Sequence, residues 1–135
     1  MTPQDLDEFA TEYFRDWEAL RGGTRAERIA YEHAGRRPSD TLVEFLLDEP
    51  TKPEVAWPVI LHLIERAPND AAIAFVAAGP LEDLLHIDGV TFGDQIVHEA
   101  RRNPRLRQAL GDVWGWERVP EPLRGRLHEL AQPKT

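Results

Sequence analysis

The densest group of residues able to do chemistry is a set of carboxylates near the middle of the chain: Glu82, Asp83, Asp88 and Asp94. Carboxylates this close in sequence could hold a hard cation or act as an acid–base pair. A structural interpretation needs no ligand. Glu82 and Asp83 follow Gly79-Pro80, so they would lie in the first turn of a helix, where negative charge stabilises the helix end by about 0.3–1 kcal/mol.

A second candidate site combines Asp94, His98 and His62. Asp94 and His98 are four residues apart on one face of a predicted helix, within reach of a shared metal ion. His62 would occupy the equivalent position of a neighbouring helix, which completes a set of ligands for a small metal-dependent enzyme. A surface ion pair between Asp94 and His98 is the simpler interpretation, so no metal and no other cofactor is assigned.

Other chemistry has less support in the residues. The chain has no cysteine, which excludes disulfides and thiolate chemistry, and Ser39 lacks a nucleophile-elbow motif. Four arginines near Trp114 and Trp116 could stack on nucleic-acid bases: Arg101, Arg102, Arg105 and Arg107. However, the net charge of −8 opposes binding to phosphate, and arginine is favoured at helix C-termini for structural reasons. Nucleic-acid binding is therefore not predicted.

The composition is that of a soluble globular domain, with 41% apolar and 30% charged residues in 135. Residues 1–100 hold 20 Asp and Glu against 8 Lys and Arg, whereas residues 101–135 hold 4 against 8. An acidic face can steer a basic partner, and it can equally be a solvated surface. No apolar run approaches the ~20 residues that span a bilayer, and no leader pattern opens the chain. We therefore expect a cytoplasmic protein without membrane contact.

The periodicity predicts a single all-α domain of about eight helices over residues 1–135. Residues 1–50 are expected to form N-terminal capping helices, with starts at Thr2-Pro3, at Thr24 and at Ser39 or Asp40. Gly22-Gly23 and Gly35 are expected to end the first two helices. An aromatic stripe in the first helix is expected to be core: Phe9, Tyr13, Phe14 and Trp17. Residues 120–131 are expected to form the C-terminal helix.

Residues 53–115 contain two copies of a helical hairpin, related by a shift of 36 residues. Ala67-Pro68 overlays Asn103-Pro104, and His62 overlays His98. The first copy opens with a helix from Pro53 to about Arg66, unless Pro58 shifts its start to Trp57. The second opens at about Val90, after a short linking helix that begins at Gly79-Pro80. Paired helices repeating every 30 to 40 residues indicate a short HEAT-like array.

Two segments resemble a family of uncharacterised bacterial proteins known as a domain of unknown function. They read Ala-Ala-Gly-Pro-Leu-Glu-Asp-Leu-Leu from Ala77 to Leu85 and Ala-Leu-Gly-Asp-Val-Trp-Gly from Ala109 to Gly115, with Arg-Arg-Asn-Pro between them at 101–104. The resemblance covers a little under half of the chain. It implies an all-helical fold and a bacterial, cytosolic origin, and it implies no activity.

The leading functional hypothesis is a non-enzymatic protein that binds another protein, because no motif identifies a reaction. Its most specific version is a small acidic immunity or antitoxin protein that inhibits a basic partner. The partner-binding candidates are Glu82, Asp83, Asp88 and Trp116. The alternatives are the metal-dependent enzyme above and a structural subunit of a homodimer.

Overall fold

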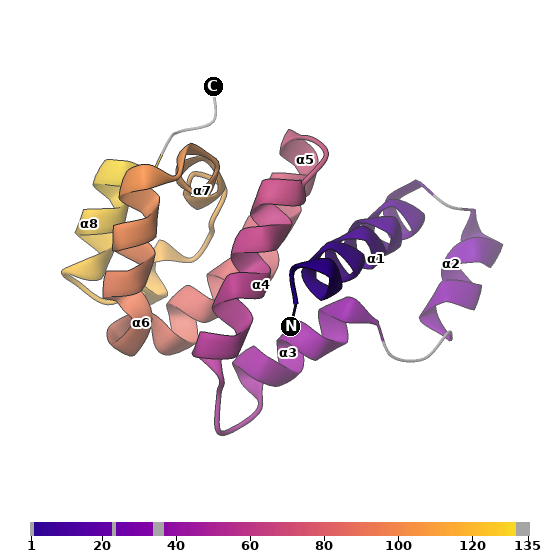
Figure 1. The fold of residues 1–135 in the computed structure, drawn as a ribbon, viewed down its shortest axis with the longest axis horizontal. Coiled ribbons are helices and arrows are strands. Elements are labelled where there is room, and N and C mark those ends of the chain that lie inside the picture. The colour runs from indigo at the N-terminus through magenta and orange to yellow at the C-terminus, as the bar shows by residue number, and fades with distance from the viewer. Residues whose placement is uncertain (1, 23, 34–36, 132–135) are drawn as a thin grey trace.

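The computed structural model describes residues 2–22, 24–33 and 37–131, which form helices and no strand (Figure 1). The all-α class is confirmed. The elements are α1 Pro3–Gly22, α2 Arg25–Glu32, α3 Pro38–Leu47, α4 Pro53–Arg66, α5 Asp70–Val76, the π-helical turn η1 Ala77–Leu81, α6 Glu82–Arg102, α7 Pro104–Leu110, the 3-10 turn η2 Trp116–Arg118 and α8 Leu123–Leu130. Gly23, Gly35 and the tail from Gln132 lie outside the described residues.

The first helices begin where their capping residues predict. The Asp5 N–H donates to Thr2 Oγ1 at 3.1 Å, and the Thr2 N–H donates back to the Asp5 carboxylate at 3.0 Å. Thr24 Oγ1 accepts from the Glu27 N–H in the same way, at 3.1 Å. The third helix starts slightly earlier than predicted, at Pro38, which suits the first helical position.

The buried apolar side chains of the described residues form one cluster, to which α1 and the helices from α3 to α8 contribute. The aromatic stripe of α1 belongs to it, as predicted, with Tyr13, Phe14 and Trp17 buried. At the other end of the chain, Leu123 and Leu127 bury one side of α8. Within the described residues, no helix is long and apolar enough to cross a membrane.

The central segment agrees with the prediction at Gly79 and differs from it further along the chain. Gly79 interrupts the helix as predicted, because its φ of −115° and ψ of −107° are not helical, so α5 and α6 meet at a kink there. The predicted linking helix and the predicted helix from Val90 are one helix, α6. Gly89 is the only glycine or proline between Leu85 and Val90, and a helix tolerates a glycine at a cost of about 1 kcal/mol.

The two predicted hairpins are present as helix pairs, α4–α5 and α6–α7, with a change in the turn. Their first helices end at Arg66 and Arg102, in agreement with the 36-residue shift. Their second helices are capped by Asn69 and Asn103, whose side chains accept from backbone N–H groups at 2.9 and 3.1 Å. These N-caps are 34 residues apart, whereas the C-caps of the first helices, Ala67 and Asn103, keep the 36-residue shift, so the first turn is two residues longer than the second. The predicted alternative start of α4 at Trp57 is wrong, because α4 begins at Pro53.

The arginines of α7 bind helix ends within the chain. Arg105 donates to the Ile64 and Ala67 carbonyls at 3.0 and 2.8 Å, and these carbonyls lie at the C-terminal end of α4. Arg107 donates to the Ala100 carbonyl near the end of α6 at 2.9 Å. The free carbonyls at a helix C-terminus need such donors. These two guanidinium groups therefore act in packing, which weakens the case for nucleic-acid binding.

Replacing Arg105 with methionine should lower the free energy of unfolding by about 1 kcal/mol, because the α4 carbonyls lose a donor. Arg101→Met is the matched control, since the Arg101 side chain is exposed at the end of α6. Urea unfolding followed by circular dichroism measures both changes. Equal stability of the two variants would show that Arg105 does not tie α7 to α4.

Candidate functional site

An open groove of about 800 Å³ runs between the C-terminal end of α1, the outer side of α5 and the segment Gly111–Trp116. We call it the aromatic groove, because three of the four tryptophans and Phe75 line it. Its lining residues are Trp17, Arg21, Ala71, Ala74, Phe75, Ala78, Gly111, Asp112, Val113, Trp114 and Trp116. The groove brings together segments that are far apart in the sequence.

The α5 wall is an apolar stripe with small side chains. Ala71, Ala74, Phe75 and Ala78 follow the spacing of one helix face, and the alanines leave the groove open above them. The Phe75 ring packs against Trp17 with ring centroids 6.1 Å apart and remains 38% exposed. This wall is thus an apolar surface that the chain itself covers only in part.

The opposite wall carries Trp114, whose backbone is held on both sides by α6. Its N–H donates to the Glu82 carboxylate at 2.9 Å, and its carbonyl lies 3.2 Å from His86 Nε2. The preceding residue, Val113, is buried at 6% exposure, whereas the Trp114 side chain is 75% exposed. A fixed backbone therefore presents a large apolar ring to solvent.

Gly115 makes this arrangement possible. Its φ is +70°, a left-handed conformation that side chains with a Cβ disfavour. A Cβ at this position would lie 2.8 Å from His86 Cε1, which is too close. Both the turn after Trp114 and the contact with His86 therefore require glycine.

Glu82 lies in the first turn of α6, as predicted. Its carboxylate also has a partner that the sequence did not indicate, because it accepts from the Trp114 N–H across 32 residues of sequence. Glu82 thus links the two segments that carry the family resemblance.

Asp83 sits beside Glu82 in a partly buried position. Burial raises the pKa of the Asp83 carboxyl above its usual range, the Glu82 charge raises it further, and His86 offsets part of the rise. Burial also raises the pKa of Tyr13, with a smaller contribution from the Asp83 charge. The Tyr13 ring in turn lies 5.7 Å from the ring of Phe75, which lines the groove.

The other two partner-binding candidates, Trp116 and Asp88, lie in different parts of the structure. Trp116 lines the groove and contacts His128 edge-on, with centroids 4.4 Å apart. Asp88 is buried elsewhere, where its Oδ1 accepts from Thr51 Oγ1 at 2.9 Å and its Oδ2 has no partner. Asp88 therefore links α6 to the loop before α4 and does not line the groove.

The residues of the candidate metal site also lie apart. His62 Nε2 is 2.7 Å from Asp7 Oδ1 on α1, and Asp94 pairs with Arg126 on α8 at 2.8 Å, which replaces the ion pair predicted with His98. Asp94 and His98 do line one smaller hollow of about 320 Å³ between α4 and α6. Across residues 2–22, 24–33 and 37–131, no three His, Cys, Asp or Glu side chains gather as metal ligands.

Sequence reasoning missed Phe75, His86 and Trp114 as site residues. One signal was available, since Phe75 belongs to an apolar stripe on the side of α5 opposite its buried residues. For Trp114, the available signal was the resemblance segment that contains it. His86 carried no signal, because its contact with Trp114 exists only after the chain has folded.

Comparison with known proteins identifies a family for most of the chain. Residues 36–134 match DUF6869, described as a family of unknown function. No curated protein and no solved structure matches the chain. The matched region contains both resemblance segments, Glu82, His86 and Trp114, while Trp17 and Arg21 on α1 lie before it.

Changing Gly115 to alanine should destabilise the protein by more than the ~1–2 kcal/mol of a left-handed alanine, because the Cβ also collides with His86. Gly22→Ala is the matched control, since nothing lies within 4 Å of a Cβ there. Thermal unfolding of both variants measures the difference. A Gly115→Ala protein as stable as the control would contradict the proposed turn.

Asp83→Asn should raise the unfolding midpoint at pH 7. The raised folded pKa means that the folded state holds the proton more tightly, so charging Asp83 costs stability as pH rises from its unfolded pKa of about 3.9. The gain should shrink as pH falls towards 3.9, where the wild-type group is also protonated. Glu117→Gln, an exposed carboxylate beside the groove, serves as control. A gain that does not change with pH would exclude the charge as its cause.

Proposed function

The chain belongs to this family of unknown function, and we propose that it is a non-enzymatic binding protein that receives a segment of a basic partner protein in the aromatic groove. The observation that carries the proposal is the 75% exposure of Trp114 on a backbone held by α6. Burying apolar surface releases about 25 cal/mol per Å². A partner that covers this indole gains that free energy without having to order the loop that presents it.

The groove has the chemistry of a protein-binding hot spot. Tryptophan and arginine dominate the energetics of protein interfaces, and the groove contains three tryptophans, Phe75 and Arg21. Grooves between helices accept short amphipathic segments, whose apolar residues enter at helical spacing. The Arg21 guanidinium already lies 5.0 Å above the Trp17 ring, so a ring of this groove already stacks with a cation. A partner's lysine or arginine can stack on Trp114 in the same way.

The charge distribution favours a basic partner. Residues 1–100 carry a balance of −12, from 20 acidic and 8 basic residues. Several C-terminal arginines bind within the chain: Arg105 and Arg107 at helix ends, Arg102 to Glu99 and Arg126 to Asp94. Because these arginines bind within the chain, the acidic excess of residues 1–100 dominates, and it can steer a basic protein towards the surface. A cation arriving near Asp83 would also stabilise its charged form, which burial and Glu82 disfavour.

A small acidic immunity or antitoxin protein that neutralises a basic toxin is the most specific form of this proposal, in a bacterial cytoplasm. It rests on size and charge: 135 residues and a net charge of −8. We also propose that α4–α5 and α6–α7 are two HEAT-like units, supported by their asparagine caps and by first helices that end 36 residues apart. Such arrays commonly bind partners along a surface built from successive repeats.

Site-specific photo-crosslinking in lysate of the source cells tests the proposal. A benzoylphenylalanine at Ala71 lines the groove and leaves its aromatic residues in place, and the same group at Val90, 81% exposed on α6, is the control. We expect one basic protein to crosslink at position 71 and not at position 90. Its yield should fall at high salt and on Trp114→Ala.

Two results would oppose groove binding. One is a set of crosslinked proteins that is the same at positions 71 and 90. The other is a position-71 product that Trp114→Ala leaves unchanged, because the exposed indole would then contribute nothing. An acidic crosslinked protein would oppose the electrostatic part of the proposal alone.

A further inference from the structure

The walls of the aromatic groove offer an occupant few backbone hydrogen bonds. In the segment after α7, four successive N–H groups already donate within the chain: those of Gly111, Asp112, Val113 and Trp114. The α5 floor is a helix, so its backbone groups bond along its own axis. The described residues also contain no strand to whose edge an extended segment could be added. An extended occupant would therefore bury backbone groups without partners, at a cost in free energy, whereas a helix pairs its own.

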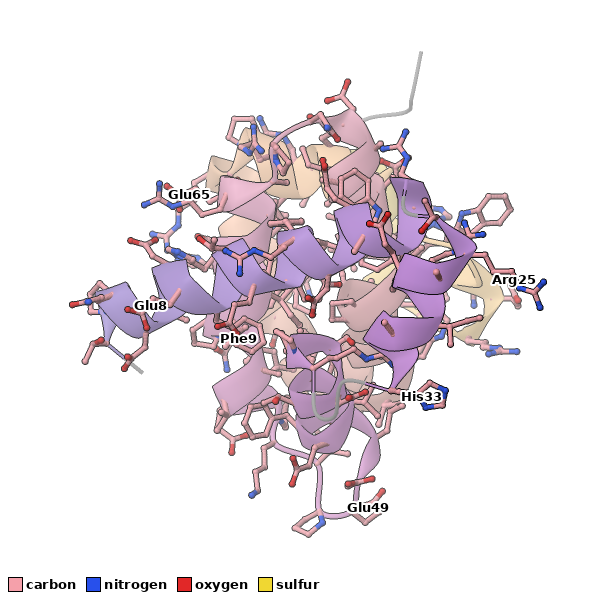
Figure 2. The ribbon with its side chains drawn as sticks, turned by 90° about the vertical axis from the view of Figure 1, so that its right-hand side faces the viewer. Glu8, Phe9, Arg25, His33, Glu49 and Glu65 are labelled. Atoms are coloured by element: carbon pink, nitrogen blue, oxygen red, sulfur yellow. The ribbon has the colours of Figure 1, made fainter. Side chains whose placement is uncertain are left out.

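The shape of the groove also suits a helix. Its floor carries three alanines on one side of α5 and η1, Ala71, Ala74 and Ala78, which span about two helical turns. Small side chains at a contact let two helix axes approach to about 8 Å. Figure 2 shows the second helical wall, α1, which runs unbroken between Glu8 and the start of α2 at Arg25. The last two turns of α1 line the groove, so a third helix would pack against two that are already in place.

Carboxylates flank the exposed indole of Trp114. Glu82 accepts from the Trp114 N–H at 2.9 Å, and Glu117 Oε1 lies 3.9 Å from where a Cβ of Gly115 would be. The cation Arg21, which also lines the groove, lies on α1. A lysine or arginine stacked on the indole would therefore be attracted by the ring and by the carboxylates beside it. The groove thus combines an apolar floor with an acidic rim at Trp114.

We propose that the occupant of the aromatic groove is an amphipathic α-helix that lies along the three alanines with a lysine or arginine over Trp114. This inference rests on the binding function proposed above and adds the conformation of the bound segment. An extended strand does not fit, because it would lack backbone partners. A proline-rich segment also docks in aromatic-lined grooves without a strand edge, so it is the rival that an experiment has to separate.

Three synthetic peptides of about 14 residues, all free of aromatic residues, test the conformation. One contains leucine, alanine and lysine at helical spacing, the second has the same residues in alternating order, and in the third prolines replace the alanines. The NMR signal of the Trp114 indole N–H, assigned by its loss in Trp114→Ala, reports binding. We expect the helical peptide to bind about tenfold more tightly than the other two, and far-UV circular dichroism to show that it gains helix on binding.

A larger side chain on the floor tests where the helix lies. Ala74→Leu should weaken binding of the helical peptide about tenfold, because it keeps the two helix axes apart. Ala26→Leu, at an exposed alanine on α2 outside the groove, is the matched control and should leave binding unchanged. Circular dichroism should show both variants folded, since neither alanine is buried.

Three results would overturn the helical occupant. The first is binding of the alternating or the proline-containing peptide as tight as that of the helical one. The second is a helical peptide that does not bind, and the third is binding that Ala74→Leu does not weaken. The binding function is tested separately by crosslinking at position 71, so a basic protein captured there while the helical peptide fails would leave that function standing and remove the helix alone.

Discussion

The hydrogen bond from the Trp114 N–H to the Glu82 carboxylate determines how the rest of the site is arranged. It joins the start of α6 to the segment after α7, and His86 completes the connection at the Trp114 carbonyl. Gly115 then turns the chain in a conformation that only glycine adopts easily next to His86. The aromatic groove exists because these contacts hold Gly111–Trp116 opposite α5.

Helical geometry explains which carboxylates take part. Glu82 and His86 are four residues apart on α6, so they lie on one side of the helix and reach the same residue. Asp88 is six residues from Glu82, which turns it to the other side, where it accepts from Thr51. Asp83 is the costly member of the group, because its charged form is opposed by burial and by Glu82. Groups that reduce stability in this way are often retained for function.

Much of the fold could be predicted from local rules. Thr2 and Thr24 accept from the helix N–H groups that their positions predict, and the α1 aromatic stripe is buried as its spacing indicates. The break at Gly79 could be predicted too, because glycine and proline there indicate it and the Gly79 dihedral angles are not helical. The length of α6 could not, because the sequence pattern indicated a separate helix from about Val90, whereas α6 runs unbroken from Glu82 to Arg102.

The site was harder to predict than the fold, for a physical reason. A local rule explained Glu82 by its place in a helix, while its actual partner lies 32 residues away. His86 and Asp7 likewise acquire their roles from distant residues, Trp114 and His62. Periodicity indicates which side of a helix is apolar. It does not indicate which two surfaces will leave a groove between them.

Hydrogen exchange at the Trp114 amide, resolved by NMR, tests the central claim most directly. The bond to Glu82 predicts slow exchange for this amide although its side chain is exposed. Glu82→Ala should abolish that protection and leave the amides of the buried α4 helix protected. An amide that already exchanges in the wild-type chain as fast as an unstructured residue would contradict the account, because Trp114 would then not be held for a partner.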